Sequence, residues 1–109
     1  MLPPQNRLTK KADFEKVRQN GKFISSKIFS LSLLDRKDKN ESRFGFIVSK
    51  KISTKSHERN RVKRILREIV RKNLGSVKSG MDFVIIVKSG IMHTTNDTIE
   101  TQLKDLINV

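Results

Sequence analysis

Apolar residues recur at helical spacing in three parts of the chain. The clearest pattern covers residues 62–74, where the apolar positions are one, three or four residues apart, as on one side of an α-helix. Gly75 follows at once and is expected to end this helix. The same spacing predicts a short first helix over residues 8–21 and a last amphipathic helix over residues 94–107.

Residue types that favour helix ends flank these segments. Thr9 is the expected N-cap of the first helix, and Gly21 can adopt the left-handed backbone conformation that ends it. Each remaining N-cap has two candidates: Ser53 or Ser56 for the long helix, and Thr95 or Asn96 for the last one. The sequence leaves both choices open.

Strands are predicted on both sides of the long helix. Residues 27–34 and 43–49 alternate between apolar and polar, and residues 22–26 form a shorter candidate. The polar segment 35–42 between the two longer strands predicts an antiparallel hairpin. Residues 81–88 are almost continuously apolar, which is typical of a central strand buried on both faces.

The resulting order of elements is α-β-β-β-α-β-α. This order predicts an α+β sandwich in which helices pack on a single sheet. A length of 109 residues fits one domain over residues 1–109, without an internal repeat or a dividing linker. Only residues 1–6 are expected to form a flexible tail.

The composition excludes several kinds of chemistry. The chain has no cysteine, and its two histidines cannot build a histidine-rich metal site. No apolar run is long enough to span a membrane, and the N-terminus lacks an apolar signal segment. No acidic pair stands in the enclosed setting that acid–base catalysis needs. We therefore expect a soluble, cytoplasmic protein with no catalytic side chain, no metal site of its own and no membrane partner.

Basic residues are concentrated in one segment. The chain carries 24 Lys+Arg against 11 Asp+Glu, a formal net charge of +13. Residues 50–72 contain ten basic and two acidic side chains, whereas residues 73–109 contain three basic and four acidic ones. The alternative is a lysine-rich solvated helix, but such clustering favours a phosphate-binding surface and predicts a polyanionic partner.

The long helix turns its basic residues away from its apolar stripe. At about 100° per residue, the side opposite the stripe holds Asn60, Arg64, Arg67 and Arg71, with Lys63 and Arg61 on its flanks. Arginine can bind a phosphate through two parallel hydrogen bonds. The helix N-terminus adds backbone N–H donors close to Lys50, Lys51 and Lys55. These features predict a polyanion site on this helix.

A second segment, residues 43–50, is superficially similar to the aromatic strand of an RNA-recognition motif, in which exposed rings stack on bases. The glycine after the first basic residue and the final aromatic of that motif are missing. We therefore interpret Phe44 and Phe46 as core residues beneath the long helix.

A longer stretch resembles the bacterial ribonuclease P protein family. The matching residues are Phe44-Gly45, Ser49-Lys50-Lys51 and Arg59-Asn60-Arg61-Val62-Lys63-Arg64. The small size, the basicity, the order of elements and the N-terminal segment 8–14 agree with that family. The Arg-Asn-Arg block followed by Lys-Arg on a helix is the specific part of the resemblance, which covers nearly the whole chain.

The resemblance implies a function and a fold. Members of the family bind a catalytic RNA as its protein subunit, one protein to one RNA, and this RNA hydrolyses the bond that releases the 5′ leader from precursor tRNA. The reaction depends on Mg²⁺ held mainly by the RNA and the substrate, and the protein supplies no catalytic side chain. The implied fold resembles ribosomal protein S5 domain 2, with a left-handed crossover around the long helix.

The resemblance also implies roles for individual residues. Those placed against the catalytic RNA, together with the next arginine on the same side of the helix, are Arg59, Asn60, Arg61, Lys63, Arg64, Arg67 and Arg71. A cleft between the sheet and the first helix holds the single-stranded leader. Phe14 matches its stacking aromatic, and its backbone contacts fall on Lys50, Lys51 and Lys88.

Two departures from the family pattern concern these sites. Arg18 stands where a second aromatic is common, and it can still stack on a leader base or bind a phosphate. Segment 52–58 lacks the usual Gly and Ala and is slightly longer, so the entry to the long helix can differ locally.

Two other functions compete with this hypothesis. A stand-alone RNA-binding or ribosome-associated module would use the same basic helix and would not affect cleavage of precursor tRNA. A protein-only nuclease would need a catalytic cluster that the sequence lacks. The protein subunit of an RNA-based endoribonuclease therefore fits the residues best.

Overall fold

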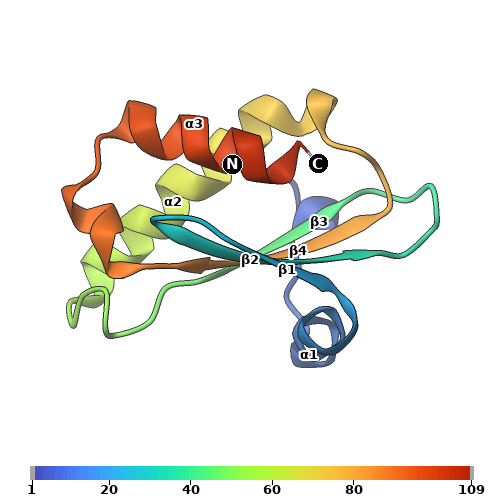
Figure 1. Cartoon of the computed structure of the whole chain (residues 1–109), viewed down its shortest axis with the longest axis horizontal. Coiled ribbons are helices and arrows are strands. Elements are labelled where there is room, and N and C mark those ends of the chain that lie inside the picture. Colours follow the sequence, from blue (N-terminus) through green and yellow to red (C-terminus); the bar gives the residue numbers. More distant parts are fainter. Residues whose placement is uncertain (1, 109) are drawn as a thin grey trace.

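The molecule is layered around one sheet. The computed structural model describes residues 2–108, in which a four-stranded sheet lies between helix α1 on one face and helices α2 and α3 on the other (Figure 1). The strands are β1 (Lys22–Ser25), β2 (Phe29–Asp35), β3 (Arg43–Ile47) and β4 (Met81–Val87). The helices are α1 (Lys11–Asn20), α2 (Ser56–Asn73) and α3 (Asn96–Ile107), with 3₁₀ turns η1 (Pro4–Asn6), η2 (Leu74–Ser76) and η3 (Ser89–His93). The predicted α+β sandwich and its order of elements are confirmed.

The order of strands in the sheet is β1-β2-β4-β3. Strand β4 pairs antiparallel with β2 and parallel with β3, so the predicted hairpin between residues 27–34 and 43–49 is wrong. The reason is that the almost entirely apolar β4 takes the central place that we predicted for it, between those two strands. Helix α2 provides the long connection that parallel neighbours require, and the left hand of this crossover stays a prediction.

Side chains of the sheet alternate between two hydrophobic cores. Phe83 and Ile85 of β4 enter the larger core with α2 and α3, whereas Val84 between them packs in a smaller core beneath α1. Phe44 stacks on Phe83 with their ring centroids 4.9 Å apart. Phe46 is half-buried against the same larger core, which confirms the interpretation of both phenylalanines as core residues.

The N-terminal segment is part of the fold. Leu2 is fully buried in the larger core, and the side-chain amide of Asn6 donates a hydrogen bond of 2.8 Å to the carbonyl oxygen of Ser42. The backbone N–H of Leu8 donates to the carbonyl oxygen of Phe44 at 2.9 Å, so the chain runs along β3. The expectation of a flexible tail is therefore wrong for residues 2–6, and Met1 lies outside the described residues.

Both ends of α1 differ from the prediction. Thr9 is not the N-cap, because Lys10 occupies that position, without a side-chain hydrogen bond to the helix. Gly21 has a φ of −87°, outside the left-handed region. A glycine is needed there because a Cβ would lie 2.3 Å from the carbonyl oxygen of Leu33. Gly75 does not end the long helix either: α2 ends at Asn73, and Gly75 lies within the 3₁₀ turn η2 that follows.

The two open choices of N-cap have different outcomes. Neither serine caps α2, because Ser56 is its first residue and Lys55 is the N-cap. The hydroxyl of Ser53 instead accepts a hydrogen bond from the backbone N–H of Lys55 at 3.2 Å. Thr95 caps α3 by accepting a hydrogen bond of 3.3 Å from the backbone N–H of Thr98.

Candidate RNA interface

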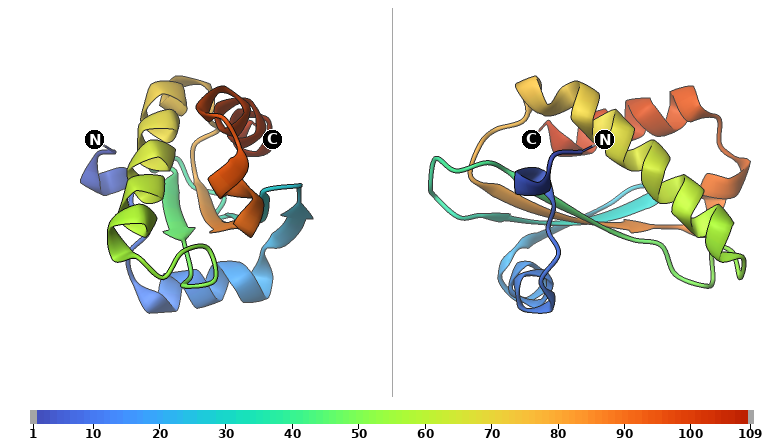
Figure 2. Two further views of the ribbon diagram at one scale, coloured as in Figure 1. Left: turned by 90° about the vertical axis from the view of Figure 1, so that its left-hand side faces the viewer. Right: turned by 180° about the vertical axis from the view of Figure 1, so that it is seen from behind.

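Helix α2 runs diagonally across the face of the sheet opposite α1, and one side of the helix is open to solvent (Figure 2). Its inner side is buried through Val62, Leu66, Ile69 and Val70. We call the outer set of residues the basic face of α2: Arg59, Asn60, Arg61, Lys63, Arg64, Arg67 and Arg71. Asn60, Arg61, Arg64 and Arg71 are exposed, and the other three are half-buried. The structure thus brings the residues assigned to catalytic-RNA binding onto one surface.

The two ends of the basic face are already engaged within the protein. The guanidinium of Arg59 donates a hydrogen bond of 2.9 Å to the carbonyl oxygen of Ser53, which fixes the loop entering α2. Arg71 pairs with Glu68, with its Nε 3.0 Å from both carboxylate oxygens. The hydrogen bonds from Arg71 lower the pKa of Glu68 to about 2, so this pair stays ionised at neutral pH.

The centre of the basic face carries cations that form no ion pair within the described part of the chain. Among residues 2–108, no ion pair involves Arg61, Lys63, Arg64 or Arg67. Guanidinium groups in this state have all their donors available for phosphate oxygens. The centre of α2 is therefore the part of the surface best suited to bind an RNA backbone.

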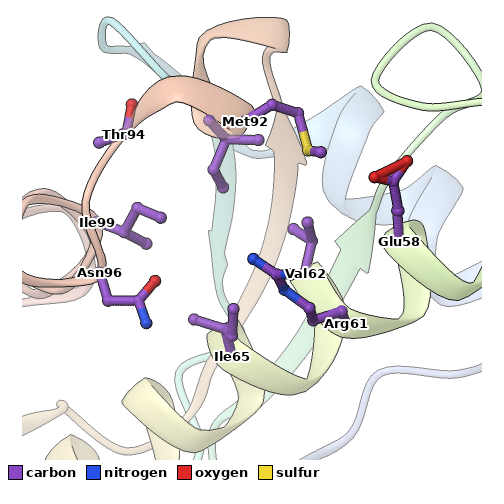
Figure 3. A pocket seen from close by; sticks show the side chains of 9 residues that line it. Glu58, Arg61, Val62, Ile65, Met92, Thr94, Asn96 and Ile99 are labelled. Carbon is purple, nitrogen blue, oxygen red and sulfur yellow. The ribbon is translucent and has the colours of Figure 1, made fainter.

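A recess lies beside this centre, between α2, η3 and the start of α3 (Figure 3). Its apolar lining comes from Val62, Ile65, Ile91 and Ile99. Arg61 and Glu58 stand on the α2 side and Asn96 on the α3 side. A hydrogen bond from Ser53 to the Glu58 carboxylate, 2.7 Å long, lowers the pKa of Glu58. The negative charge of Glu58 therefore lies beside Arg61, among the basic residues near the N-terminus of α2.

Phe14 lies on the opposite face of the sheet, where its ring reaches Gly45 of β3. Its half-buried ring belongs to the smaller core and covers Gly45, because a Cβ at Gly45 would lie 2.4 Å from the ring carbon Cζ. The Phe-Gly pair of the family signature thus includes a glycine that makes room for an aromatic side chain of α1. The sequence identifies Phe14 and Gly45 separately, but it does not reveal that they are in contact.

Replacing Gly45 with alanine is expected to destabilise the protein by about 1–3 kcal/mol, because the added methyl group forces the Phe14 ring to move. The matched control is Gly75→Ala, since no atom lies within 4 Å of the methyl group added there. Urea unfolding of both variants measures the difference. Equal free energies of unfolding would contradict the contact between Gly45 and Phe14.

The lysines assigned to the leader come to one end of the sheet. Strands β3 and β4 are parallel with Ile47 beside Ile86, so Lys50, Lys51 and Lys88 all follow the same ends of these strands. Lys50 and Lys51 are exposed. The Nζ of Lys88 donates hydrogen bonds of 2.7 Å to the Ser25 hydroxyl and 2.6 Å to the Ser26 carbonyl oxygen.

Arg18 is exposed on α1, one helical turn after Phe14. Residues one turn apart lie on the same side of a helix, so Arg18 and Phe14 border the same region. The structure therefore places an aromatic ring and an arginine on the face of the sheet that α1 covers, and three lysines at one end of the same sheet.

An ion-pair network missed by the sequence reasoning holds α1 in place. Asp82 is buried in β4, and its carboxylate accepts hydrogen bonds of 2.7 Å from Arg36 and 2.7 and 2.9 Å from Arg43. Arg43 also reaches Asp13 of α1 at 3.3 Å. These carboxylates, Asp82 first, raise the pKa of Arg43. The available signal was Asp82 itself, the one acidic residue in segment 81–88, which is predicted to be buried.

Among residues 2–108, no group of three or more His, Cys, Asp or Glu side chains is placed to hold a metal ion. No helix in this part of the chain is long and apolar enough to cross a membrane.

Comparison with known proteins decides the family. Residues 2–109 match the sequence model of the family described as Ribonuclease P. The chain belongs to this family. A ribonuclease P protein component from Pseudanabaena is 36% identical over 107 residues, which cover 98% of this chain and 92% of that protein. The one from Clostridium acetobutylicum is 38% identical, with 95% of this chain and 87% of that protein covered.

Solved structures agree with this result. The ribonuclease P protein from Thermotoga maritima superposes with a TM-score of 0.84 at 28% identity, covering 94% of this chain and 97% of the other. The protein from Staphylococcus aureus gives 0.83 at 25% identity, covering 92% and 90%. The resemblance inferred from the Arg-Asn-Arg block is confirmed at the level of family and fold.

Family membership defines the enzyme and the partner. The chain is a protein subunit of a ribonuclease P endoribonuclease, which acts in tRNA processing, and its partner is the ribonuclease P RNA.

Proposed function

We propose that this subunit binds two RNAs at once, on opposite faces of its sheet. The basic face of α2 binds the ribonuclease P RNA, and the sheet surface beside α1, on the opposite face, binds the 5′ leader of precursor tRNA. The observation that carries this proposal is the separation of the two regions by the sheet itself (Figure 1). With such an arrangement, one small protein can connect the catalytic RNA to its substrate in a one-to-one complex.

The chemistry of each face suits its RNA. Structured RNA presents phosphates, which are bound by the unpaired guanidinium groups at the centre of α2. A single-stranded leader presents unstacked bases and a flexible backbone, which are typically held by aromatic rings and flanking cations. The α1 face combines both through Phe14, Arg18, Lys50, Lys51 and Lys88.

Catalysis in this proposal belongs to the RNA, acting in the cytoplasm. The residues of this chain do not fit a metal site, because residues 2–108 hold no cluster of ligating side chains. We therefore place the Mg²⁺ on the RNA and substrate phosphates and assign no step to a metal held by the protein. The contribution of the protein is to bind and orient precursor tRNA.

Reconstitution tests this function. Ribonuclease P RNA alone is compared with RNA plus protein for cleavage of precursor tRNA at low Mg²⁺ concentration. We expect the protein to restore cleavage that the RNA alone no longer supports, because the added cations replace part of the metal ion screening. A folded protein that binds structured RNAs with similar affinity and leaves cleavage unchanged would instead be a general RNA-binding module.

Phe14→Ala is expected to weaken binding of precursor tRNA by the assembled enzyme about fivefold or more, because one stacked base is lost. Mature tRNA, which has no leader, should bind with unchanged affinity. Phe14→Leu is the matched variant, since it keeps apolar packing against Gly45 and removes the aromatic ring. If both variants weaken mature and precursor tRNA equally, Phe14 has no role in leader binding.

A further inference from the structure

A row of four residues crosses the sheet on the face that α1 covers. Phe23 of β1 stands opposite Ser32, Ser32 opposite Val84, and Val84 opposite Gly45. Directly opposed residues of neighbouring strands project from the same face. Because the Phe14 ring covers Gly45, the row has an aromatic ring at each end.

The ring of Phe23 is unusual in its exposure. It is 62% exposed at the free edge of the sheet, whereas Phe14 is half-buried. The other large apolar side chain exposed among residues 2–108 is Met92, at 39%. An exposed phenylalanine on an edge strand offers a flat apolar surface that the fold itself does not use.

The surroundings of Phe23 suit a nucleic acid strand. Ser25 and Ser30, opposite each other in register, lie on the same face as Phe23 and present short polar side chains. The Lys88 ammonium is held against Ser25 at 2.7 Å, which fixes a positive charge two residues along β1 from Phe23. Lys27, two residues after the end of β1, is also exposed. This combination of an exposed ring and flanking cations is complementary to a single-stranded polyanion.

We propose that Phe23 is a second stacking platform for the leader of precursor tRNA, and that it holds a different nucleotide from the one at Phe14. Three strand spacings separate β1 from β3, about 14 Å in total. Stacked bases follow each other at only about 3.4 Å along a strand, so the two rings cannot hold the same or adjacent stacked bases. The inference rests on the proposed function, because it assumes that the leader follows this face.

The test uses the enzyme assembled from ribonuclease P RNA and protein, with precursor tRNAs that carry single abasic nucleotides at successive leader positions. We expect Phe23→Ala to weaken binding of the intact precursor about fivefold or more and to leave mature tRNA unchanged. One abasic position should abolish the effect of Phe23→Ala, and a different position should abolish that of Phe14→Ala. Phe23→Tyr should bind like the unmodified protein.

Met92→Ala is the matched control, since it also removes an exposed apolar side chain but lies in η3, on the other side of the sheet. If Phe14→Ala weakens precursor binding and Phe23→Ala does not, the inference about Phe23 is wrong and the proposed function stands. If neither variant weakens binding of precursor tRNA, the proposed function is wrong. Weaker binding of ribonuclease P RNA or of mature tRNA by Phe23→Ala would also overturn the inference, because the ring would then act elsewhere.

Discussion

Replacing Arg61, Arg64 and Arg67 together with alanine is expected to weaken binding of ribonuclease P RNA on the order of 100-fold, because three charge-assisted contacts to phosphates are lost. The slope of log affinity against log salt concentration should fall by up to about three, roughly one for each phosphate contact. Filter binding or fluorescence titration at several salt concentrations measures both quantities. The fold should be unaffected, since none of these side chains has an ion-pair partner among residues 2–108.

The matched control removes three lysines outside this surface, Lys39, Lys78 and Lys104, all of them exposed. Both triple variants lower the net charge by three, and the lysine variant loses in addition only the exposed pair of Lys78 with Asp35, which contributes little. A local binding surface predicts a much larger loss for the α2 variant. Equal losses would mean that the net charge of +13, and not the basic face, determines the affinity.

The position of each arginine within α2 refines this expectation. Arg71 already donates to the Glu68 carboxylate, so its guanidinium has fewer free donors for a phosphate than that of Arg64. Arg59 is tied to the Ser53 carbonyl and orders the loop before the helix. The strongest RNA contacts should therefore come from the middle of the basic face.

Local patterns made α2 predictable from the sequence. The spacing of Val62, Leu66, Ile69 and Val70 determines which side of the helix is buried, and the opposite side then has to carry the basic residues. The same reasoning identified β4 as a central strand. These predictions depend on neighbours a few residues apart, where the physics of one element suffices.

Features that depend on contacts between residues far apart in the sequence could not be predicted in the same way. The pairing of β3 with β4 depends on α2 packing across the sheet, and a short polar segment between two strands resembles a hairpin whatever the third strand does. Leu2 fills a place in the core that no periodicity reveals. The site shows the same limit: the residues of each RNA-binding face could be named, but the close fit of Phe14 to Gly45 emerged only in three dimensions.

Replacing Asp82 with alanine is expected to destabilise the protein by about 2–4 kcal/mol, because Arg36 and Arg43 lose their shared partner while partly buried. The matched control is Asp35→Ala at the end of β2, which loses only exposed contacts, a pair of 3.4 Å with Lys78 and a hydrogen bond from the backbone N–H of Lys37, and should therefore cost much less stability. Urea unfolding compares the two variants. Arg43 also pairs with Asp13 of α1, so Asp82→Ala should shift the position of Arg43 and of α1 and weaken binding of precursor tRNA more than that of mature tRNA. If Asp82→Ala costs no more stability than Asp35→Ala, the network does not hold α1 against the sheet.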